Sequence, residues 1–180
     1  MDYYLGVGSK HLPEINRLSK TDNAETDDKL LHYAMEGIRL NGTFGSYRRS
    51  TVSTTVTDGD RQVPLNSGDK VFVSFVSAAR DPKVFPNPDE VVIDRPIESY
   101  IHYDVGEHSC LGKEASMVAL TAMLRTVGKL DGLRGAPGPQ GELMKIPQPG
   151  GFYVYYEGGP WQLFCVPVHN ESALRWGVAI

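Results

Sequence analysis

The spacing of apolar residues predicts two helices in the first forty residues. The first apolar face consists of Leu12, Ile15 and Leu18, and turn-forming residues at 21–23 interrupt it. We expect Thr26 to be the N-cap of the second helix, because a hydroxyl there can accept a backbone N–H. The apolar face that follows consists of Leu30, Leu31, Ala34, Met35 and Ile38. Asn41-Gly42 predicts the end of this helix.

The hydrophobic pattern changes to a period of two over residues 47–73. The segment 51–57 is rich in β-branched residues, and the Asp-Gly pair that follows it is a strong hairpin signal. We therefore expect a return strand over 63–65. A further turn then precedes a strand over 71–73.

The rest of the chain alternates between irregular segments and regular elements. Four prolines over 81–96 predict an ordered meander. A small-residue stripe beyond it predicts a helix, and we expect this stripe to face the core: Ala115, Val118, Ala119, Ala122, Met123, Thr126, Val127 and Leu130. Strands over 152–156 and 161–168 predict a terminal hairpin. No repeat or linker divides the chain, so the pattern predicts one α+β unit over 1–180, mainly helical with short β-hairpins.

Composition and charge exclude several classes of function. Hydrophobic residues form 41% of the chain and charged residues 22%, which excludes a largely disordered protein. The net charge is −4 and no block of Lys or Arg occurs, so we expect no nucleic-acid partner. The start lacks the features of a signal peptide, and no apolar run approaches the ~20 residues of a membrane span. With only two cysteines, these features predict a soluble chain in the cytoplasm.

The chemically most informative segment is the loop 103–112, which lies directly before the predicted helix at 115–130. Cys110 stands in it between Gly106 and Gly112. The glycines allow backbone N–H groups to approach the sulfur, and the helix N-terminus supplies partial positive charge that favours a thiolate. An anionic sulfur in this setting suits a soft or borderline metal, and haem iron is one case.

The loop resembles the haem-binding signature of the cytochrome P450 family. The shared pattern is an aromatic residue, two residues, Gly, three residues, Cys, one residue and Gly, with Tyr103 where Phe is usual. The segment 36–39, Glu-Gly-Ile-Arg, resembles the E-x-x-R element of the family, and Arg95 matches the arginine of its meander. The three elements occur in the order of the family, over roughly residues 25–170. An E-x-x-R element alone carries little weight.

Two further segments are similar to a fungal subfamily. Residues 27–47 and 149–155 resemble the C-terminal domain of psi-factor-producing oxygenases, or linoleate diol synthases. Those proteins join a haem dioxygenase domain to a haem-thiolate domain that isomerises a fatty-acid hydroperoxide into a diol. The resemblance implies a lipid hydroperoxide as substrate, a dioxygenase domain as partner, and no need for a reductase or NADPH.

The resemblance also implies roles for particular residues. Cys110 would be the catalytic residue and the axial ligand of haem b, within a loop shaped by Gly106 and Gly112. His108 and Arg48 would bind the haem propionates, because an arginine fork matches a carboxylate; Arg49 is an equal rival by register. A structural ion-pair network beneath the haem would consist of Glu36, Arg39 and Arg95.

Other interpretations remain open on the sequence. One is a conventional monooxygenase fragment that uses O₂ and a reductase; the acidic Glu107 in the cysteine loop favours the isomerase slightly, because many reductase-dependent members are basic on that side. Another is a non-catalytic, truncated remnant. A lone cysteine is usually an inert apolar residue. A zinc site formed by His102, His108 and Cys110 would lack a fourth ligand.

The sequence departs from the family in length. Only about 35 residues precede Glu36, and they contain no candidate for the distal helix that crosses the haem. We therefore expect a partial haem-thiolate domain over residues 1–180 that lacks its N-terminal half. A single wall would leave the apolar face of the helix at 27–41 in water. We expect weak or no haem binding by the chain alone, marginal folding, and enzymatic activity only in the parent protein.

Overall fold

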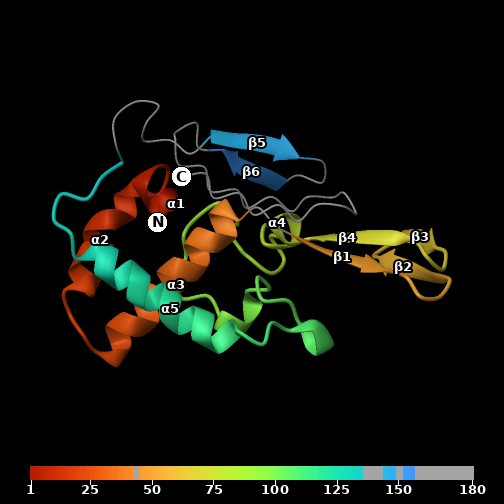
Figure 1. Cartoon of the computed structure of the whole chain (residues 1–180), viewed down its shortest axis with the longest axis horizontal. Helices are drawn as coiled ribbons and strands as arrows, with labels where there is room; N and C mark the ends of the chain where they lie inside the picture. The colour runs from red at the N-terminus through yellow and green to blue at the C-terminus, as the bar shows by residue number, and fades with distance from the viewer. Residues whose placement is uncertain (43–44, 136–143, 149–151, 157–180) are drawn as a thin grey trace, which may run out of the picture.

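Three helices, α2, α3 and α5, pack against one another in the half of the molecule that contains the N-terminus (Figure 1). The computed structural model describes residues 1–42, 45–135, 144–148 and 152–156. The helices of this half are α1 (Asp2–Leu5), α2 (Leu12–Ser19), α3 (Ala24–Asn41) and α5 (Lys113–Gly128). The strands of the described residues form two-stranded sheets, so the predicted α+β class, mainly helical with short hairpins, is confirmed.

Helix α3 begins at a capping box that the sequence analysis placed incorrectly. The N-cap is Asn23, whose side-chain oxygen accepts the N–H of Thr26 at 2.9 Å. In return, the N–H of Asn23 donates to the hydroxyl of Thr26 at 3.3 Å. Thr26 is therefore the third residue of the helix and not its cap, because the backbone is still extended at Asn23.

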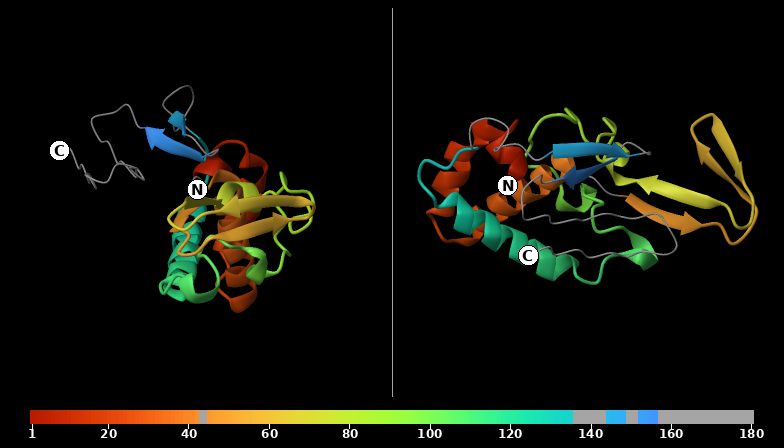
Figure 2. Two further views of the ribbon diagram at one scale, coloured as in Figure 1. Left: turned by 90° about the vertical axis from the view of Figure 1, so that its right-hand side faces the viewer. Right: turned by 45° about the horizontal axis from the view of Figure 1, so that its top comes forward.

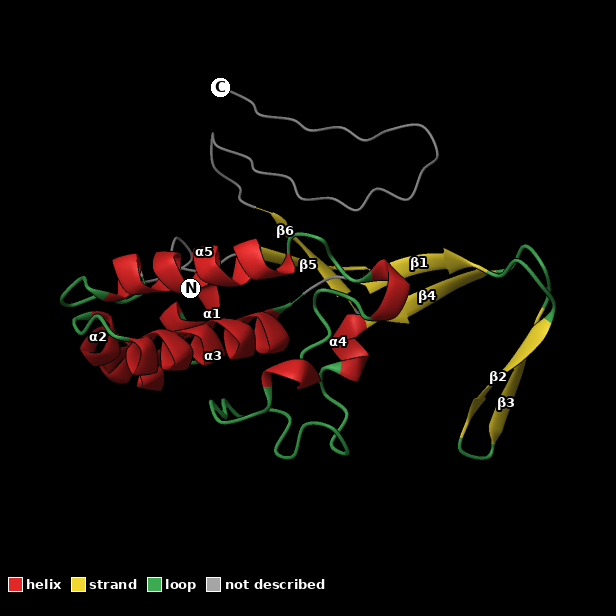
Figure 3. Ribbon diagram, turned by 90° about the horizontal axis from the view of Figure 1, so that it is seen from below, coloured by secondary structure: helices red, strands yellow, loops and turns green. Residues whose placement is uncertain are grey.

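The apolar face of α3 is buried, so the expectation that it would lie in water is wrong. Helices α1, α2 and α5 cover it (Figure 3). The core cluster consists of Tyr4, Ile15, Leu18, Leu30, Tyr33, Ala34 and Leu124. The hydroxyl of Tyr4 donates to the carbonyl oxygen of Tyr33 at 2.5 Å, which ties α1 onto α3 and satisfies a buried polar group.

Helix α5 is turned so that the predicted core stripe faces outward. Val118 and Met123 are 71% and 65% exposed. The buried positions are instead Thr121, Leu124, Arg125 and Gly128. Arg125 can be buried because its guanidinium donates to the carbonyl of Leu18 and to Asp27. At the end of the helix, a Cβ on Gly128 would lie 2.3 Å from the Ser19 hydroxyl, so glycine allows α5 to approach α2 closely.

Two antiparallel hairpins follow α3 and extend away from the helices (Figure 2). Strand β1 (Gly45–Arg49) pairs with β4 (Lys70–Ser74), and between them β2 (Thr54–Asp58) pairs with β3 (Arg61–Leu65). The predicted Asp-Gly turn is confirmed, because Gly59 joins β2 to β3 with φ 56°. The pairing of β1 with β4 was not predicted, and it places Arg48 opposite Val71.

The remaining described residues are mostly irregular. Helix α4 (Phe75–Ala78) leads into the meander, and two short turns, η2 (Ile97–Ser99) and η3 (Gly106–His108), precede α5. Strand β6 (Phe152–Tyr156) is where the sequence predicted a strand, but its partner is β5 (Met144–Gln148), upstream of it. The expected partner at 161–168 and the second cysteine, Cys165, lie outside the described residues. No helix within the described ranges has the length and apolar character to cross a membrane.

Candidate functional site

The cysteine loop is closed by backbone hydrogen bonds and runs directly into α5. The N–H of Cys110 donates to the carbonyl of Tyr103 at 2.7 Å, which joins the two ends of the loop across η3. The N–H of Lys113 then donates to the carbonyl of Cys110 at 3.1 Å. Gly112 is the N-cap of α5, so the sulfur-bearing residue lies two positions before the cap and three before the first helical residue, Lys113.

The thiol of Cys110 is exposed and has apolar neighbours. Leu111 is fully exposed beside it, and Val105 is 63% exposed earlier in the loop. Gly106 has φ 69°, a left-handed conformation that favours glycine. For a Cβ built on Gly112, the sulfur of Cys110 at 3.8 Å is the one atom found within 4 Å, chain neighbours aside. No other described side chain therefore fills the space between Gly112 and the sulfur. The loop therefore presents an exposed cysteine together with two exposed apolar side chains, which leaves room for a flat apolar group at this face.

Tyr103 anchors this loop to α5 in a way that the sequence analysis missed. Its hydroxyl donates to the hydroxyl of Ser116, one turn into the helix, at 3.0 Å. A phenylalanine at this position would lack that bond. The only sequence signal was the presence of tyrosine where the family pattern has phenylalanine. His108, by contrast, is exposed at the end of η3 and forms no side-chain hydrogen bond within the described residues.

Arg48, and not its rival Arg49, faces the cysteine loop. Arg48 is half-buried on β1, and its Nη2 forms an ion pair with the carboxylate of Asp104. Its Nη1 donates to the carbonyl of Tyr47 at 3.0 Å. Arg49 is exposed and reaches only the carbonyl of Gly68, at 3.5 Å. The structure thus brings Arg48 to the loop that contains Cys110.

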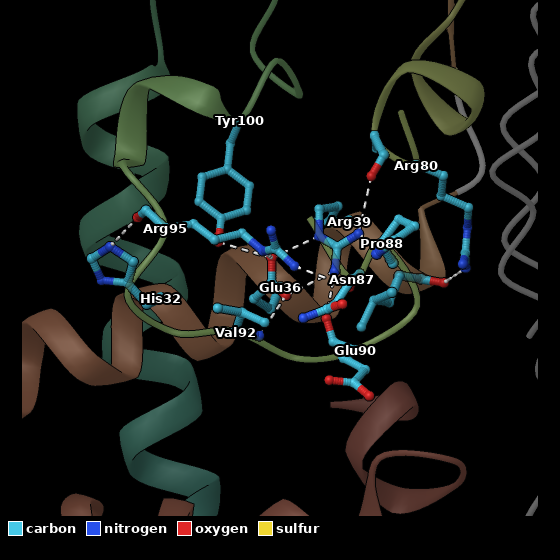
Figure 4. A network of polar contacts seen from close by, with 12 residues as sticks. His32, Glu36, Arg39, Arg80, Asn87, Pro88, Glu90, Val92, Arg95 and Tyr100 are labelled. Carbon is cyan, nitrogen blue, oxygen red and sulfur yellow. Dashed lines mark hydrogen bonds and ion pairs between the residues drawn. The ribbon is translucent and has the colours of Figure 1, made fainter. Parts of the chain in front are cut away.

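Beneath the loop, Glu36 and Arg39 form a fully buried ion pair on α3 (Figure 4). Nε of Arg39 donates to one carboxylate oxygen of Glu36 at 2.6 Å, and Nη2 donates to the other at 2.8 Å. The i, i+3 spacing places both side chains on one face of the helix. This two-bond geometry is the strongest that an arginine and a carboxylate form.

The remaining donors of Arg39 hold the meander. Its Nη1 donates to the carbonyls of Ala79 and Pro88 at 3.0 and 2.5 Å, and its Nη2 donates to the carbonyl of Glu90 at 2.8 Å. One arginine therefore binds the backbone carbonyl at the end of α4 and two carbonyls of the meander, so it satisfies peptide groups that no regular element pairs.

Arg95 is the third member of the network. Its Nε lies 3.4 Å from a carboxylate oxygen of Glu36, and its Nη2 donates to the carbonyl of Pro86 at 2.8 Å. The guanidinium carbons of Arg39 and Arg95 lie 5.2 and 5.5 Å from the ring centre of the buried Phe85. The ion-pair contacts expected among Glu36 and the two arginines are therefore present, with an aromatic ring adding cation–π attraction.

The electrostatics of this network keep Glu36 ionised. Burial raises the pKa of the carboxyl, but hydrogen bonds from Arg39, the Val92 N–H and Tyr100 outweigh burial, and the pKa of Glu36 is lowered. The Tyr100 hydroxyl donates to Glu36 at 2.9 Å. Burial and the nearby negative charge of Glu36 raise the pKa of Tyr100, so the phenol stays protonated.

His102 lies near this network and is neutral at physiological pH. Burial is the main cause that lowers its pKa to about 4. Its Nε2 is buried with no hydrogen-bond partner within the described residues. No three His, Cys, Asp or Glu side chains in the described ranges come together as a metal site, so the zinc alternative gains no support.

Comparison with known proteins identifies relatives over most of the chain. It is 54% identical, over 93% of its length, to a bifunctional dioxygenase–epoxy alcohol synthase of Pyricularia oryzae. It is 43% identical over 98% to psi-producing oxygenase A of Aspergillus fumigatus, and 39% identical over 82% to a linoleate diol synthase of Gaeumannomyces graminis. The chain covers 15%, 16% and 15% of these three proteins. The resemblance to the fungal subfamily is confirmed.

A family model and a solved structure agree on the fold. The structure superposes on that of CalO2 with a TM-score of 0.63 at 23% identity, covering 84% of this chain and 35% of that one. The model for "Cytochrome P450" matches residues 34–127, more than half of the chain, from within α3 to the end of α5. The chain belongs to the cytochrome P450 family.

Proposed function

We propose that this chain is the cysteine-bearing part of a haem-thiolate enzyme that converts a fatty-acid hydroperoxide into an isomeric product. The observation that carries the proposal is the exposed Cys110, held by a closed loop just before α5. Haem is the cofactor of the cytochrome P450 family, to which the chain belongs. The described residues fit this group, because Cys110 is exposed and the loop that contains it is joined to Arg48 through Asp104.

We assign the following roles to the residues of the site. Cys110 binds the haem iron as a thiolate, and Arg48 and His108 bind the two propionates. Haem b fits this set, since it carries two free propionates and the sequence has no C-x-x-C-H segment for covalent attachment. When bound, a haem with a thiolate ligand supplies chemistry that cleaves O–O bonds.

The network below the site has a supporting role. Glu36, Arg39 and Arg95 hold the meander against α3, and the meander in turn leads into the cysteine loop. No hydrogen bond or ion pair among the described residues joins these side chains to Cys110, so we assign them no direct part in the chemistry. Their function is to keep the loop in one conformation, because a ligand that shifts by an ångström loses much of its effect.

The relatives and the chemistry together support the substrate class. One relative is named a linoleate diol synthase and another a dioxygenase–epoxy alcohol synthase. A diol and an epoxy alcohol are both isomers of an unsaturated hydroperoxide: the O–O bond breaks and both oxygens remain in the product. Neither reaction needs an external reductant. We propose a diol as the product, as in the name of the linoleate diol synthase. An epoxy alcohol is the second candidate, because the identity to the epoxy alcohol synthase is higher, 54% against 39%.

We further propose that the site is completed by another part of a longer protein. The chain spans about 15% of the relatives and about a third of the solved structure that it matches. The outward-facing apolar side of α5, with Val118 and Met123, provides a surface for such a part. A cytoplasmic location agrees with this proposal, since a thiol ligand must stay reduced.

The first test is spectroscopic. The purified chain is reconstituted with hemin, and a reduced-plus-CO difference spectrum is recorded beside that of Cys110→Ala. Because the chain carries only part of the pocket, we expect a weak Soret band typical of thiolate ligation in the wild type at excess hemin, and its loss in the variant. A spectrum that is identical in both proteins would overturn the assignment of Cys110.

A second assay distinguishes the isomerase from a conventional monooxygenase. A longer, haem-loaded protein that contains this chain is incubated with a linoleate hydroperoxide in the absence of any reductase or NADPH, and the products are analysed by mass spectrometry. A diol or an epoxy alcohol of unchanged elemental composition would support the proposal and decide between the two products. Conversion that requires NADPH and a reductase would favour the monooxygenase.

A further inference from the structure

Asp104 occupies a backbone position that is unfavourable for it. Its φ is 61°, in the left-handed region, where glycine is favoured and other residues are strained by about 1 kcal/mol. Aspartate tolerates this conformation better than most residues, because its side chain can bond locally. Here Oδ1 accepts the N–H of Val105 at 3.0 Å. The other carboxylate oxygen, Oδ2, takes no part in this local bond and binds a residue of β1.

That second oxygen binds Arg48, which lies 56 positions earlier in the chain. The side chains of Arg48 and Asp104 are 36% and 26% exposed, so the pair lies at the boundary between the interior and solvent. Arg48 is also the residue to which the proposed function assigns a haem propionate. A propionate is a carboxylate, and Asp104 therefore offers Arg48 the same chemical group that the haem would bring.

The donors of Arg48 are limited in number. Its Nη1 is already engaged by the hydroxyl of Ser46 and the carbonyl of Tyr47. Nη2 and Nε are left for carboxylates, and Asp104 binds Nη2. A propionate that approaches with the usual two-bond geometry needs the same edge of the guanidinium. Asp104 and a propionate cannot both bind Nη2 and Nε of Arg48 at the same time.

We propose that Asp104 is an internal competitor of the haem propionate for Arg48. In the haem-free chain it neutralises the arginine, and it must be displaced or must share the arginine when haem binds. This inference rests on the proposed function and deepens it. It assigns Asp104 as a positioning residue that weakens porphyrin binding and leaves one uncompensated negative charge at the edge of the site.

The test uses metal-free protoporphyrin IX, so that its outcome does not depend on Cys110. Because we expect the chain alone to bind haem weakly, binding to the wild type and to Asp104→Asn is followed by porphyrin fluorescence in a longer protein that contains this chain. Asparagine keeps the size, the local bond to Val105 and the tolerance for φ 61°, but removes the charge. We expect Asp104→Asn to bind protoporphyrin IX about two- to fivefold more tightly, the range of a partly exposed ion pair.

Three controls make the test specific. Glu107→Gln removes another carboxylate of the same loop, one with no ion pair to Arg48, and should change binding much less. Protoporphyrin IX dimethyl ester has no free carboxylate, so Asp104→Asn should not tighten its binding. In an Arg48→Gln background, the gain from Asp104→Asn should largely disappear. Asp104→Gly, which fits φ 61° without strain, replaces the asparagine variant if circular dichroism shows that the latter is misfolded.

The proposal is overturned if Asp104→Asn binds the free-acid porphyrin no more tightly than the wild type, which includes the case where neither binds detectably. It is also overturned if Glu107→Gln or the dimethyl ester shows the same gain. The failure of the proposed function looks different. In that case, hemin shows no thiolate-type spectrum dependent on Cys110, whatever Asp104→Asn does to the metal-free porphyrin.

Discussion

The carboxylate of Glu36 lies 2.6 and 2.8 Å from two donors of the Arg39 guanidinium, and both side chains are fully buried. The pair is stable in the interior because every other donor and acceptor in it is satisfied. Two buried charges of opposite sign cost little only while both are present. Removal of one leaves the other without compensation in a medium of low dielectric constant.

We therefore expect Glu36→Gln to lower the free energy of unfolding by about 3–5 kcal/mol. Urea denaturation followed by circular dichroism measures this loss. The matched control is Glu14→Gln, which breaks an i, i+3 pair with Arg17 at the surface. That variant should be nearly as stable as the wild type, since solvent screens exposed pairs. Equal losses in the two variants would show that burial does not determine the strength of the pair.

A second prediction concerns pH and His102. The folded state holds the pKa of this imidazole at about 4, against 6.5 in the unfolded chain. Between these two values the unfolded state takes up a proton that the folded state does not bind. Protonation of His102 in the unfolded chain therefore lowers the free energy of unfolding as the pH falls from 6.5 towards 4, whereas above pH 6.5 this free energy keeps its full value. Its full size is about 3 kcal/mol.

Denaturation curves at pH 7, 6, 5 and 4 measure this fall, and His102→Asn is the comparison. The variant has no group that titrates at this site, so its free energy of unfolding should fall less over the same interval. The Glu36 carboxyl, whose pKa is lowered from 4.5, begins to lose its contribution at about pH 4.5, at the acid end of this interval, but it does so in the wild type and in the variant alike. A variant profile parallel to that of the wild type would mean that His102 is accessible to protons in the folded chain.

The cysteine loop and the ion-pair helix could be predicted from the sequence because their chemistry fixes residue types at fixed spacings. A thiol between glycines before a helix and two opposite charges one turn apart each carry little weight alone, but their occurrence together in the order of the family is informative without tertiary information. The α+β class and the Asp-Gly hairpin could be predicted for a similar reason, since local turn chemistry and periodicity determine them.

The orientation of α5 could not be predicted, because its buried face contains an arginine and a threonine. Hydrophobic periodicity assigns Arg125 to the surface, whereas three-dimensional packing offers its guanidinium a carbonyl and a carboxylate from other helices. The partnership of Arg48 with Asp104 was missed for a related reason. It depends on the pairing of β1 with β4 and on a left-handed backbone conformation, and neither has a strong sequence signal.

A third prediction tests the two faces of α5. Leu124→Ala removes a buried side chain from the core cluster and should lower the free energy of unfolding by about 2–5 kcal/mol. Val118→Ala alters the exposed face of the same helix and should change it by less than about 0.5 kcal/mol. Urea denaturation measures both variants. The opposite order would mean that the stripe expected from the sequence is the one that faces the core.

The fourth prediction concerns the tyrosine that replaces phenylalanine in the loop. The Tyr103 hydroxyl donates to Ser116 at 3.0 Å, and this bond joins the start of the loop to the first turns of α5. Tyr103→Phe should lower the free energy of unfolding by about 1 kcal/mol, the usual net contribution of one hydrogen bond. Ser116→Ala should cost a similar amount, and the double variant should cost little more than either single variant, because all three lack the same bond.

The same variants show whether this bond also affects the sulfur. Tyr103 accepts the N–H of Cys110 through its backbone, so a looser tyrosine ring should loosen the closure of the loop. Hydrogen exchange at the Cys110 amide measures that closure, and we expect faster exchange in both Tyr103→Phe and Ser116→Ala. Exchange as slow as in the wild type would show that the backbone bond closes the loop by itself, and that the hydroxyl contributes to stability alone.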